Sequence, residues 1–218
     1  MKKFLRAFTL IEMLVVIAII SIVAAMVAGM ASAAKNKQHA AQVEGNKQKL
    51  ILLIANYQSK LNFYPPDNAN LAEYSLPNYN PRNYDAWAAT NPLLYELSGA
   101  TNLTNGNIFV FNGVQISGSD YATAYGRNGV ANSNPDEPHY FYTPRSINEY
   151  SYYIFNGGTN ECAGFTVPVS LTNVPFTNYW HYDASSTNRH NLSSYDLWAE
   201  YSIGTKGGSN IVVTNGNW

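Results

Sequence analysis

A single carboxylate, Glu12, stands at the start of a long apolar segment and has the clearest chemical potential in this sequence. No charged side chain occurs between Met13 and Ala34, so a helix over this stretch would extend roughly 33 Å, enough to cross the hydrocarbon core of a bilayer. A carboxylate in such a helix costs about 2.5–3.5 kcal/mol on insertion scales, and such acids usually have a partner or a function. Phe8, four residues earlier, would lie at the level of Glu12 on the same face of a helix, so a cation at that level on a laterally packed copy could pair with the carboxylate. The simpler alternative is that Glu12 reaches the cytoplasmic headgroups beside the helix N-terminus.

Little else in the sequence suggests catalysis. It contains no Gly-x-Ser-x-Gly, His-Glu-x-x-His, Walker or Gly-x-Gly-x-x-Gly motif. His181, Asp183 and His190 could in principle bind a metal, but their spacing matches no established ligand pattern, which favours polar residues of a loop between strands. Trp180 and Trp198 could stack on sugars, although packing in an aromatic core is the favoured interpretation. We therefore expect neither an enzyme nor a metal site.

A short basic leader precedes the apolar segment. Lys2, Lys3 and Arg6 should hold the N-terminus in the cytoplasm, so that the remainder of the chain is translocated. The Ala-Ser-Ala sequence at 31–33 matches an ordinary signal-peptidase site, and cleavage there would release a soluble protein that begins at Ala34. Against that alternative, the apolar stretch is longer than the about 7–15 residues of a secretory signal and has an acid near its start.

The residues at this end also resemble the class III signal of type IV pilins and of the pseudopilins of type II secretion. The basic leader and a small residue, Ala7, are followed by Phe-Thr-Leu-Ile-Glu at 8–12 and an apolar helix. The resemblance implies that a prepilin peptidase cuts between Ala7 and Phe8 and methylates the new amino terminus. It also implies that Glu12 pairs with the terminus of a neighbouring subunit. The family usually has Gly at the position of Ala7, which is a change between two small residues.

Size and composition allow one membrane helix and one globular domain of about 150 residues. A formal charge of −1 over 218 residues gives no electrostatic signature of nucleic-acid binding. Only 12% of residues are charged and 17 are tyrosines, which is typical of an exported β-rich domain. The one cysteine, Cys162, cannot form an intramolecular disulfide such as classical type IV pilins have near the C-terminus, and we expect it to be a partly buried small side chain.

The first half of the fold is predicted to be one continuous helix from Phe8 to about Asn62. Apolar residues recur at helical spacing beyond the membrane segment, and no proline occurs before Pro65. Residues 1–7 would be the leader, 8–34 the transmembrane or filament-core half of the helix, and 35–64 its amphipathic half. Gly29 and Gly45 are the positions where it could bend. The periodic apolar residues are Val43, Leu50, Ile54, Tyr57 and Leu61.

Residues 65–145 have the composition of a loop-rich insert, because Asn, Pro, Tyr and Gly are abundant. One strand is expected at 108–111. One short helix is expected near 92–98, with Asn91 as N-cap, Pro92 in the first turn and Gly99 as terminator. Its apolar face would comprise Leu93, Leu94 and Leu97.

Residues 146–218 are predicted to form an antiparallel sheet, which makes the whole an α+β fold with the long helix packed against the sheet. Aromatic and β-branched runs place strands at 150–155, 179–182, 195–203 and 211–213. In the third run, apolar residues alternate with Asp196, Trp198, Glu200 and Ser202, so one face should pack on the helix.

The C-terminal part resembles the major pseudopilin of type II secretion in its closing pattern, which comprises Tyr-Trp-His-Tyr at 179–182, residues 194–198, residues 202–208 and a terminal Asn-Trp. Major pseudopilins bind calcium in the loop after the last long strand, through an Asp two residues beyond a Ser-x-Gly element and further acids. This chain has Lys206 at the first of those positions and no Asp or Glu after Glu200. We therefore expect no conventional calcium site and no other cofactor.

Together these features predict a structural subunit, a pseudopilin that prepilin peptidase cleaves and that polymerises through its N-terminal helix into a periplasmic filament for type II secretion. The expected partners are other copies of the chain, prepilin peptidase, an inner-membrane assembly platform, minor pseudopilins and membrane lipid, with no nucleic acid. The precursor should span the bacterial inner membrane once, with its C-terminal domain in the periplasm. The alternatives are a type IV pilus subunit for adhesion, motility or DNA uptake, and a membrane-tethered or secreted binding module.

Overall fold

The longest element of the fold is helix α1 (Leu10–Leu61), which has 52 residues and a length of about 78 Å. The computed structural model describes residues 9–68, 91–102, 105–110, 115–133, 139–143, 149–155, 160–171, 177–206 and 209–218. The helix continues through Gly29 and Gly45 and ends at Asn62, whose left-handed backbone (φ 64°) lets its N–H donate to the Gln58 carbonyl at 2.8 Å. The long helix expected from the sequence is confirmed, with its first turn beginning at Leu10.

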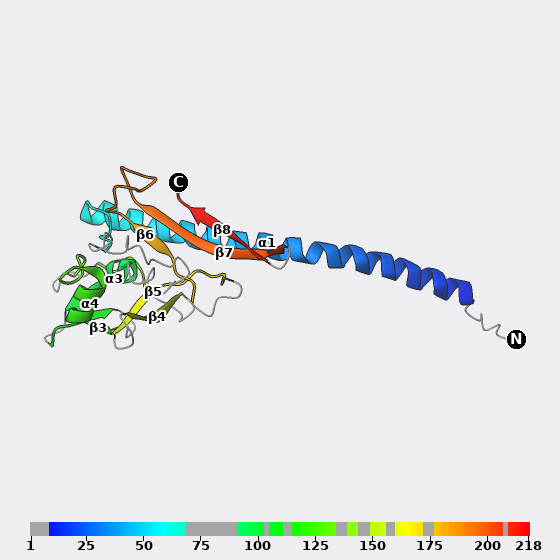
Figure 1. Cartoon of the computed structure of the whole chain (residues 1–218), viewed down its shortest axis with the longest axis horizontal. Helices are drawn as coiled ribbons and strands as arrows, with labels where there is room; N and C mark the ends of the chain where they lie inside the picture. Colours follow the sequence, from blue (N-terminus) through cyan, green and yellow to red (C-terminus); the bar gives the residue numbers. More distant parts are fainter. Residues whose placement is uncertain are drawn as a thin grey trace, which may run out of the picture.

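The remaining described elements form a head around the C-terminal half of α1, while the N-terminal half projects from it (Figure 1). One sheet comprises β6 (His181–Asp183), β7 (Asp196–Lys206) and β8 (Ser209–Gly216), in that order and antiparallel. A second pairs β4 (Tyr150–Phe155) with β5 (Asn160–Phe165), also antiparallel. The third sheet comprises β1 (Ala100–Asn102), β2 (Asn107–Val110) and β3 (Gln115–Ser117), with the short helices α3 (Leu93–Ser98) and α4 (Gly118–Tyr125) beside it. This architecture is the α+β, pilin-like fold that the sequence predicted.

Strand β7 packs against α1 as its alternating sequence predicts. Leu197 and Ala199 are fully buried and Tyr201 nearly so, whereas Trp198 and Glu200 between them are only partly buried. On the helix, Val43, Ile54 and Tyr57 have no exposed surface. Apolar residues recur at every second position in the strand and at every third or fourth position in the helix, so each element has one apolar face. These two faces form one apolar interface.

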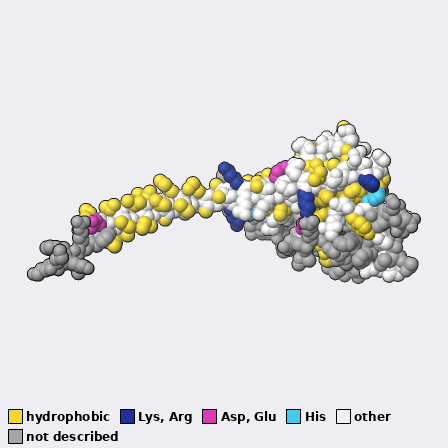
Figure 2. Space-filling model, turned by 180° about the vertical axis from the view of Figure 1, so that it is seen from behind, with side chains coloured by type: hydrophobic (Ala, Val, Ile, Leu, Met, Phe, Trp, Pro, Cys, Tyr) yellow, Lys and Arg dark blue, Asp and Glu magenta, His cyan; other side chains and the backbone are white. Residues whose placement is uncertain are grey.

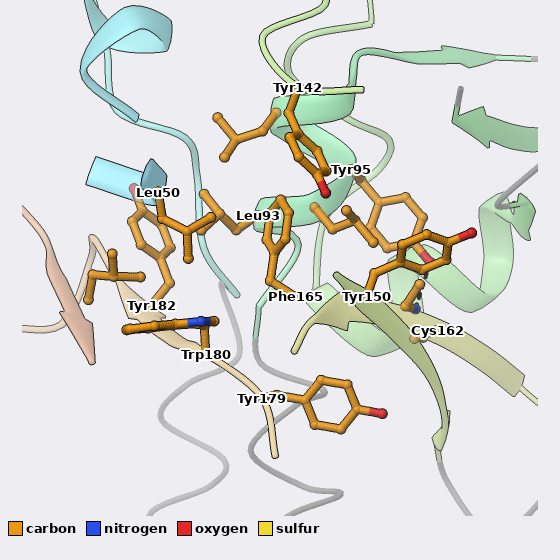
Figure 3. Close-up of a cluster of buried hydrophobic side chains, with 14 of the residues drawn as sticks. Leu50, Leu93, Tyr95, Tyr142, Tyr150, Cys162, Phe165, Tyr179, Trp180 and Tyr182 are labelled. Carbon is orange, nitrogen blue, oxygen red and sulfur yellow. Dashed lines mark hydrogen bonds between the residues drawn. The ribbon is translucent and has the colours of Figure 1, made fainter. Parts of the chain in front are cut away.

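Aromatic side chains join the sheets to α1 and α3. Leu50 of α1 and Leu93 of α3 lie in the same cluster as Phe165, Trp180 and Tyr182 (Figure 3). The indole N–H of Trp180 donates to Asn46 Oδ1 at 2.6 Å, which ties this cluster to the helix. In the same core, the rings of Tyr95 and Tyr121 meet edge to face at 5.5 Å.

A buried carboxylate, Glu96, links α3 to the end of α1. The Tyr57 hydroxyl donates to it at 2.9 Å, and the backbone N–H groups of Ala131 and Asn132 donate at 2.9 and 3.1 Å. Burial raises the pKa of Glu96 to about 7. The predicted apolar face of this helix was too narrow, because all six residues of α3 are buried. The Asn91 side chain does accept from the Leu93 N–H at 2.9 Å, but the helix itself begins after Pro92, which takes the cap position.

The strands predicted in the last third are present, with shifted ends and one addition. They lie in two sheets, and an isolated bridge pairs Thr166 with Tyr179 outside both of them. The strand expected at 179–182 therefore begins only at His181. Strand β5 was not predicted, because its sequence, Asn-Glu-Cys-Ala-Gly-Phe, has little intrinsic β propensity. It forms a strand through its antiparallel pairing with β4. Helix α4 was also missed, although Ser117 caps it by accepting from the Asp120 N–H at 3.0 Å.

We predict that Leu50→Ala lowers the free energy of unfolding by about 2–5 kcal/mol, because it removes a buried side chain and leaves a cavity. The matched control is Leu52→Ala on the same helix, where the side chain is 61% exposed and the expected change is within about 0.5 kcal/mol. Urea unfolding of the full chain in detergent, followed by tryptophan fluorescence, measures both. Equal losses in the two variants would contradict the packing described.

Candidate assembly site on the N-terminal half of the long helix

The N-terminal half of α1 is an apolar surface without cover from the rest of the chain. We call residues 10–34 the bare segment; every described side chain in it is exposed. Its large apolar side chains, from Leu10 to Met30, are 45–84% exposed, and Figure 2 shows them as a continuous apolar rod beside the head. Among the described residues, α1 is the one helix long and apolar enough to cross a membrane. A surface of this kind requires either lipid or other apolar surfaces around it.

Glu12 closes a hydrogen-bonded cap at the start of the bare segment. The Thr9 N–H and hydroxyl donate to Glu12 Oε2 at 2.8 and 2.7 Å, and the Glu12 N–H donates to Thr9 Oγ1 at 3.3 Å. This reciprocal pair satisfies two of the backbone N–H groups that a helix start leaves unpaired, and it places a negative charge at the positive end of the helix dipole. In a single subunit, therefore, the cost of keeping this carboxylate beside lipid is partly offset by its own helix.

The sequence interpretation missed the part played by Thr9. A Thr followed three residues later by Glu is a recognisable capping pattern, so the signal was present. The helix was expected to include Phe8 and so to align it with Glu12, but the helical turns begin at Leu10 because Thr9 adopts an extended backbone (φ −81°, ψ 149°). Ala7 and Phe8, the predicted processing site, lie outside the described residues.

His181, Asp183 and His190 do not converge on one point. The buried His181 ring stacks on Trp198 with a centroid distance of 5.0 Å, and burial lowers its pKa to about 4. His190 stacks on Trp218 at 4.1 Å and its Nδ1 lies 3.1 Å from Asp196 Oδ2. Asp183 Oδ1 instead accepts two backbone N–H groups of the following turn. Within the described ranges, no three His, Cys, Asp or Glu side chains are grouped as metal ligands.

The other residues considered for binding are engaged in packing. Trp180 is 1% exposed, so its ring face is not open to a ligand. Cys162 is completely buried rather than partly buried as expected, and burial raises the pKa of its thiol to about 12. Lys206, at the position where the family has a calcium-binding Asp, is opposite Ser209 in the pairing of β7 with β8. Only residues 207–208 separate the two strands, and they lie outside the described residues.

Comparison with known proteins adds one finding at this end of the chain. Residues 5–28 match the family model described as the prokaryotic N-terminal methylation motif. The match includes Ala7, Phe8 and Glu12. These features support a type IV pilin-like protein. Subunits with this motif are structural and are processed at the N-terminus rather than acting as enzymes, and the motif together with the bare segment supports a membrane-anchored protein. No curated protein and no solved structure matches the chain.

The neutral, buried His181 makes stability depend on pH. Because its pKa is lowered from 6.5 to about 4, the unfolded chain binds the proton more readily, and stability is lost as pH falls from about 6.5 towards 4. Between pH 7.5 and 4.5 we expect the wild-type protein to lose on the order of 2–3 kcal/mol more of its unfolding free energy than His181→Gln. Urea unfolding of both proteins at the two pH values measures the difference, and parallel pH profiles would show that His181 is not the group responsible.

Proposed function

We propose that this chain is a pseudopilin, cleaved by prepilin peptidase between Ala7 and Phe8, that polymerises into a periplasmic filament serving type II protein secretion. The precursor spans the inner membrane once, with the basic leader in the cytoplasm and the head in the periplasm. Its partners are other copies of the chain, the peptidase, the inner-membrane assembly platform and minor pseudopilins.

The observation that carries this proposal is the bare segment itself. It is continuous with a folded head through one uninterrupted helix, and no described part of the chain covers it. In the membrane, lipid tails cover it. In a filament, the same segments of neighbouring subunits replace the lipid, and close helix packing compensates for the lost lipid contact.

Glu12 supplies the specificity that apolar packing lacks. Its Oε2 is used by the Thr9 cap, whereas within the described residues Oε1 accepts no hydrogen bond. After cleavage, the ammonium of Phe8 on an adjacent subunit can bind this carboxylate while the cap remains. A charge pair of this kind, shielded from water, penalises every axial offset that separates the two groups, and so it fixes the stagger between subunits.

Two features favour the secretion system over a pilus. Cys162 is a single, buried cysteine, so the head has no intramolecular disulfide. The C-terminal pattern resembling major pseudopilins forms β6, β7 and β8, the sheet that packs on α1. A type IV pilus subunit is the second candidate, because the methylation motif occurs in both systems. Deleting the gene in its native host separates them: lost export with intact surface pili supports the pseudopilin, and the reverse supports the pilin.

We predict that Glu12→Ala leaves the protein inserted in the membrane but reduces filament yield about tenfold or more, because an ammonium left without its buried partner costs about 3–5 kcal/mol. Glu12→Gln should fail as well; a Gln still closes the capping box but carries no charge. The matched control is Ser21→Ala in the same segment, since Ser21 bonds only to the Ile17 carbonyl of its own helix. Sheared-filament yield and membrane fractionation measure the two properties. Wild-type yield from Glu12→Gln would show that the charge is not used.

Processing gives a separate prediction about the mature N-terminus. Mass spectrometry of the protein from its host should find a chain that begins with N-methylated Phe8. Co-expression with an inactive prepilin peptidase should leave the leader attached. A mature chain that begins at Ala34 would instead show secretion by ordinary signal peptidase and would exclude filament assembly through the bare segment.

A further inference from the structure

The region where α1 enters the head carries positive charges without acidic neighbours in sequence. Between Glu12 and Glu44 the only Lys, Arg, Asp or Glu residues are Lys35 and Lys37. After Glu200 the only one is Lys206. Two stretches of chain far apart in sequence therefore contribute basic residues and no acids.

The fold brings these two stretches to the same level of the molecule. Gly204 lies beside Asn36, because a Cβ built on this glycine would be 3.8 Å from Asn36 Nδ2. Lys206 is the last residue of β7, and the paired ends of β7 and β8 lie where the bare segment ends (Figure 1). Lys35 and Lys37 are exposed, and Figure 2 shows basic side chains on opposite sides of the rod at this junction. We call Lys35, Lys37 and Lys206 the basic neck.

Apolar side chains accompany the basic neck on the adjacent strand. Ile211 and Val212 of β8, just beyond the hairpin end, are 38% and 46% exposed. Lysines beside exposed aliphatic side chains form the combination with which proteins bind at a membrane interface, where the apolar groups enter the headgroup layer and the charges contact anionic lipid.

The rest of the head has the opposite charge. Beyond residue 43 the chain has 13 acidic residues and, apart from Lys206, seven basic ones. An anionic membrane surface would therefore attract the neck and repel the remainder of the head. Because the bare segment ends at Ala34, directly before Lys35, the neck lies at the depth of the headgroups whenever α1 spans the bilayer.

We propose that the basic neck docks the head on anionic phospholipid headgroups of the leaflet from which α1 emerges. This inference rests on the membrane-inserted precursor in the proposed function. The docked neck holds the hairpin of β7 and β8 against the membrane surface and so gives waiting subunits a defined height and tilt. Removal from the membrane breaks these contacts, and the neck then becomes available to neighbouring subunits.

The test places a polarity-sensitive fluorophore at Ser209→Cys, one residue from the hairpin connection. Cys162 is fully buried and its thiol pKa is about 12, so it stays unlabelled in the folded protein. The full chain is reconstituted into vesicles of phosphatidylcholine alone or mixed equally with phosphatidylglycerol. We expect a blue-shifted emission only with phosphatidylglycerol, and its loss in about 1 M salt, where the Debye length is about 3 Å.

Each of Lys35→Gln, Lys37→Gln and Lys206→Gln should lower the ratio of docked to undocked heads about fivefold in the anionic vesicles. The matched control is Lys60→Gln, in the last turn at the other end of α1, which should leave the ratio unchanged. Emission that ignores lipid charge, or a loss of docking in Lys60→Gln as large as that in the three neck variants, would overturn the docking proposal. A shift that follows protein density instead of lipid charge would assign the neck to a second copy of the chain and would also overturn it.

Flotation of the same vesicles after an alkaline wash reports insertion independently. A chain that fails to float would contradict the membrane-inserted precursor. A chain that floats in both lipids while its neck ignores phosphatidylglycerol would contradict only the docking.

Discussion

An apolar half-helix without cover from its own chain is the constraint on which everything else in this structure depends. The bare segment cannot fold back on the head, because α1 is continuous from Leu10 to Leu61 and the head already packs against one face of its other half. Its surface must therefore be covered by lipid or by other subunits. Those two environments are nearly equivalent in polarity, so a subunit can exchange one for the other without exposing the segment to water. In the proposed assembly the folded head stays in water throughout, which separates the assembly surface from the globular fold.

Charged groups mark the two ends of the bare segment and distinguish one end from the other. At one end, Glu12 belongs to a cap formed with Thr9, which secures the first helical turn and keeps the carboxylate at a fixed height. At the other, the apolar run stops at Lys35, where the hairpin of β7 and β8 meets the helix near Asn36. The segment is therefore a rod of defined length, with an acid near the amino terminus and basic residues near the head. Apolar packing alone would allow neighbouring rods to slide, whereas charges at fixed positions select one offset.

The sequence predicted those parts of the fold in which a periodic pattern and a terminator agree. The helix from the N-terminal motif to Asn62 and the buried face of β7 follow from such patterns, and Thr9 was visible in the Thr-x-x-Glu spacing although the sequence interpretation did not use it. Burial of Glu96 was not predictable, because its partners Tyr57 and Ala131 come from other elements that meet only in the folded head. Strand β5 was not predictable either, because its β propensity is weak and it depends on pairing with β4. His181 and His190 were grouped because they are close in sequence, but in the fold they stack on different tryptophans.

The most direct test of the central claim is to identify what covers the bare segment before and after assembly. A lipid-soluble carbene reagent, activated by light in native membranes and in purified filaments, marks side chains that touch lipid. We expect strong labelling between Leu10 and Met30 in membranes, little labelling of the same residues in filaments, and none at Leu52 in either. Residues 10–30 that remain equally labelled in filaments, or that are never labelled in membranes, would contradict it.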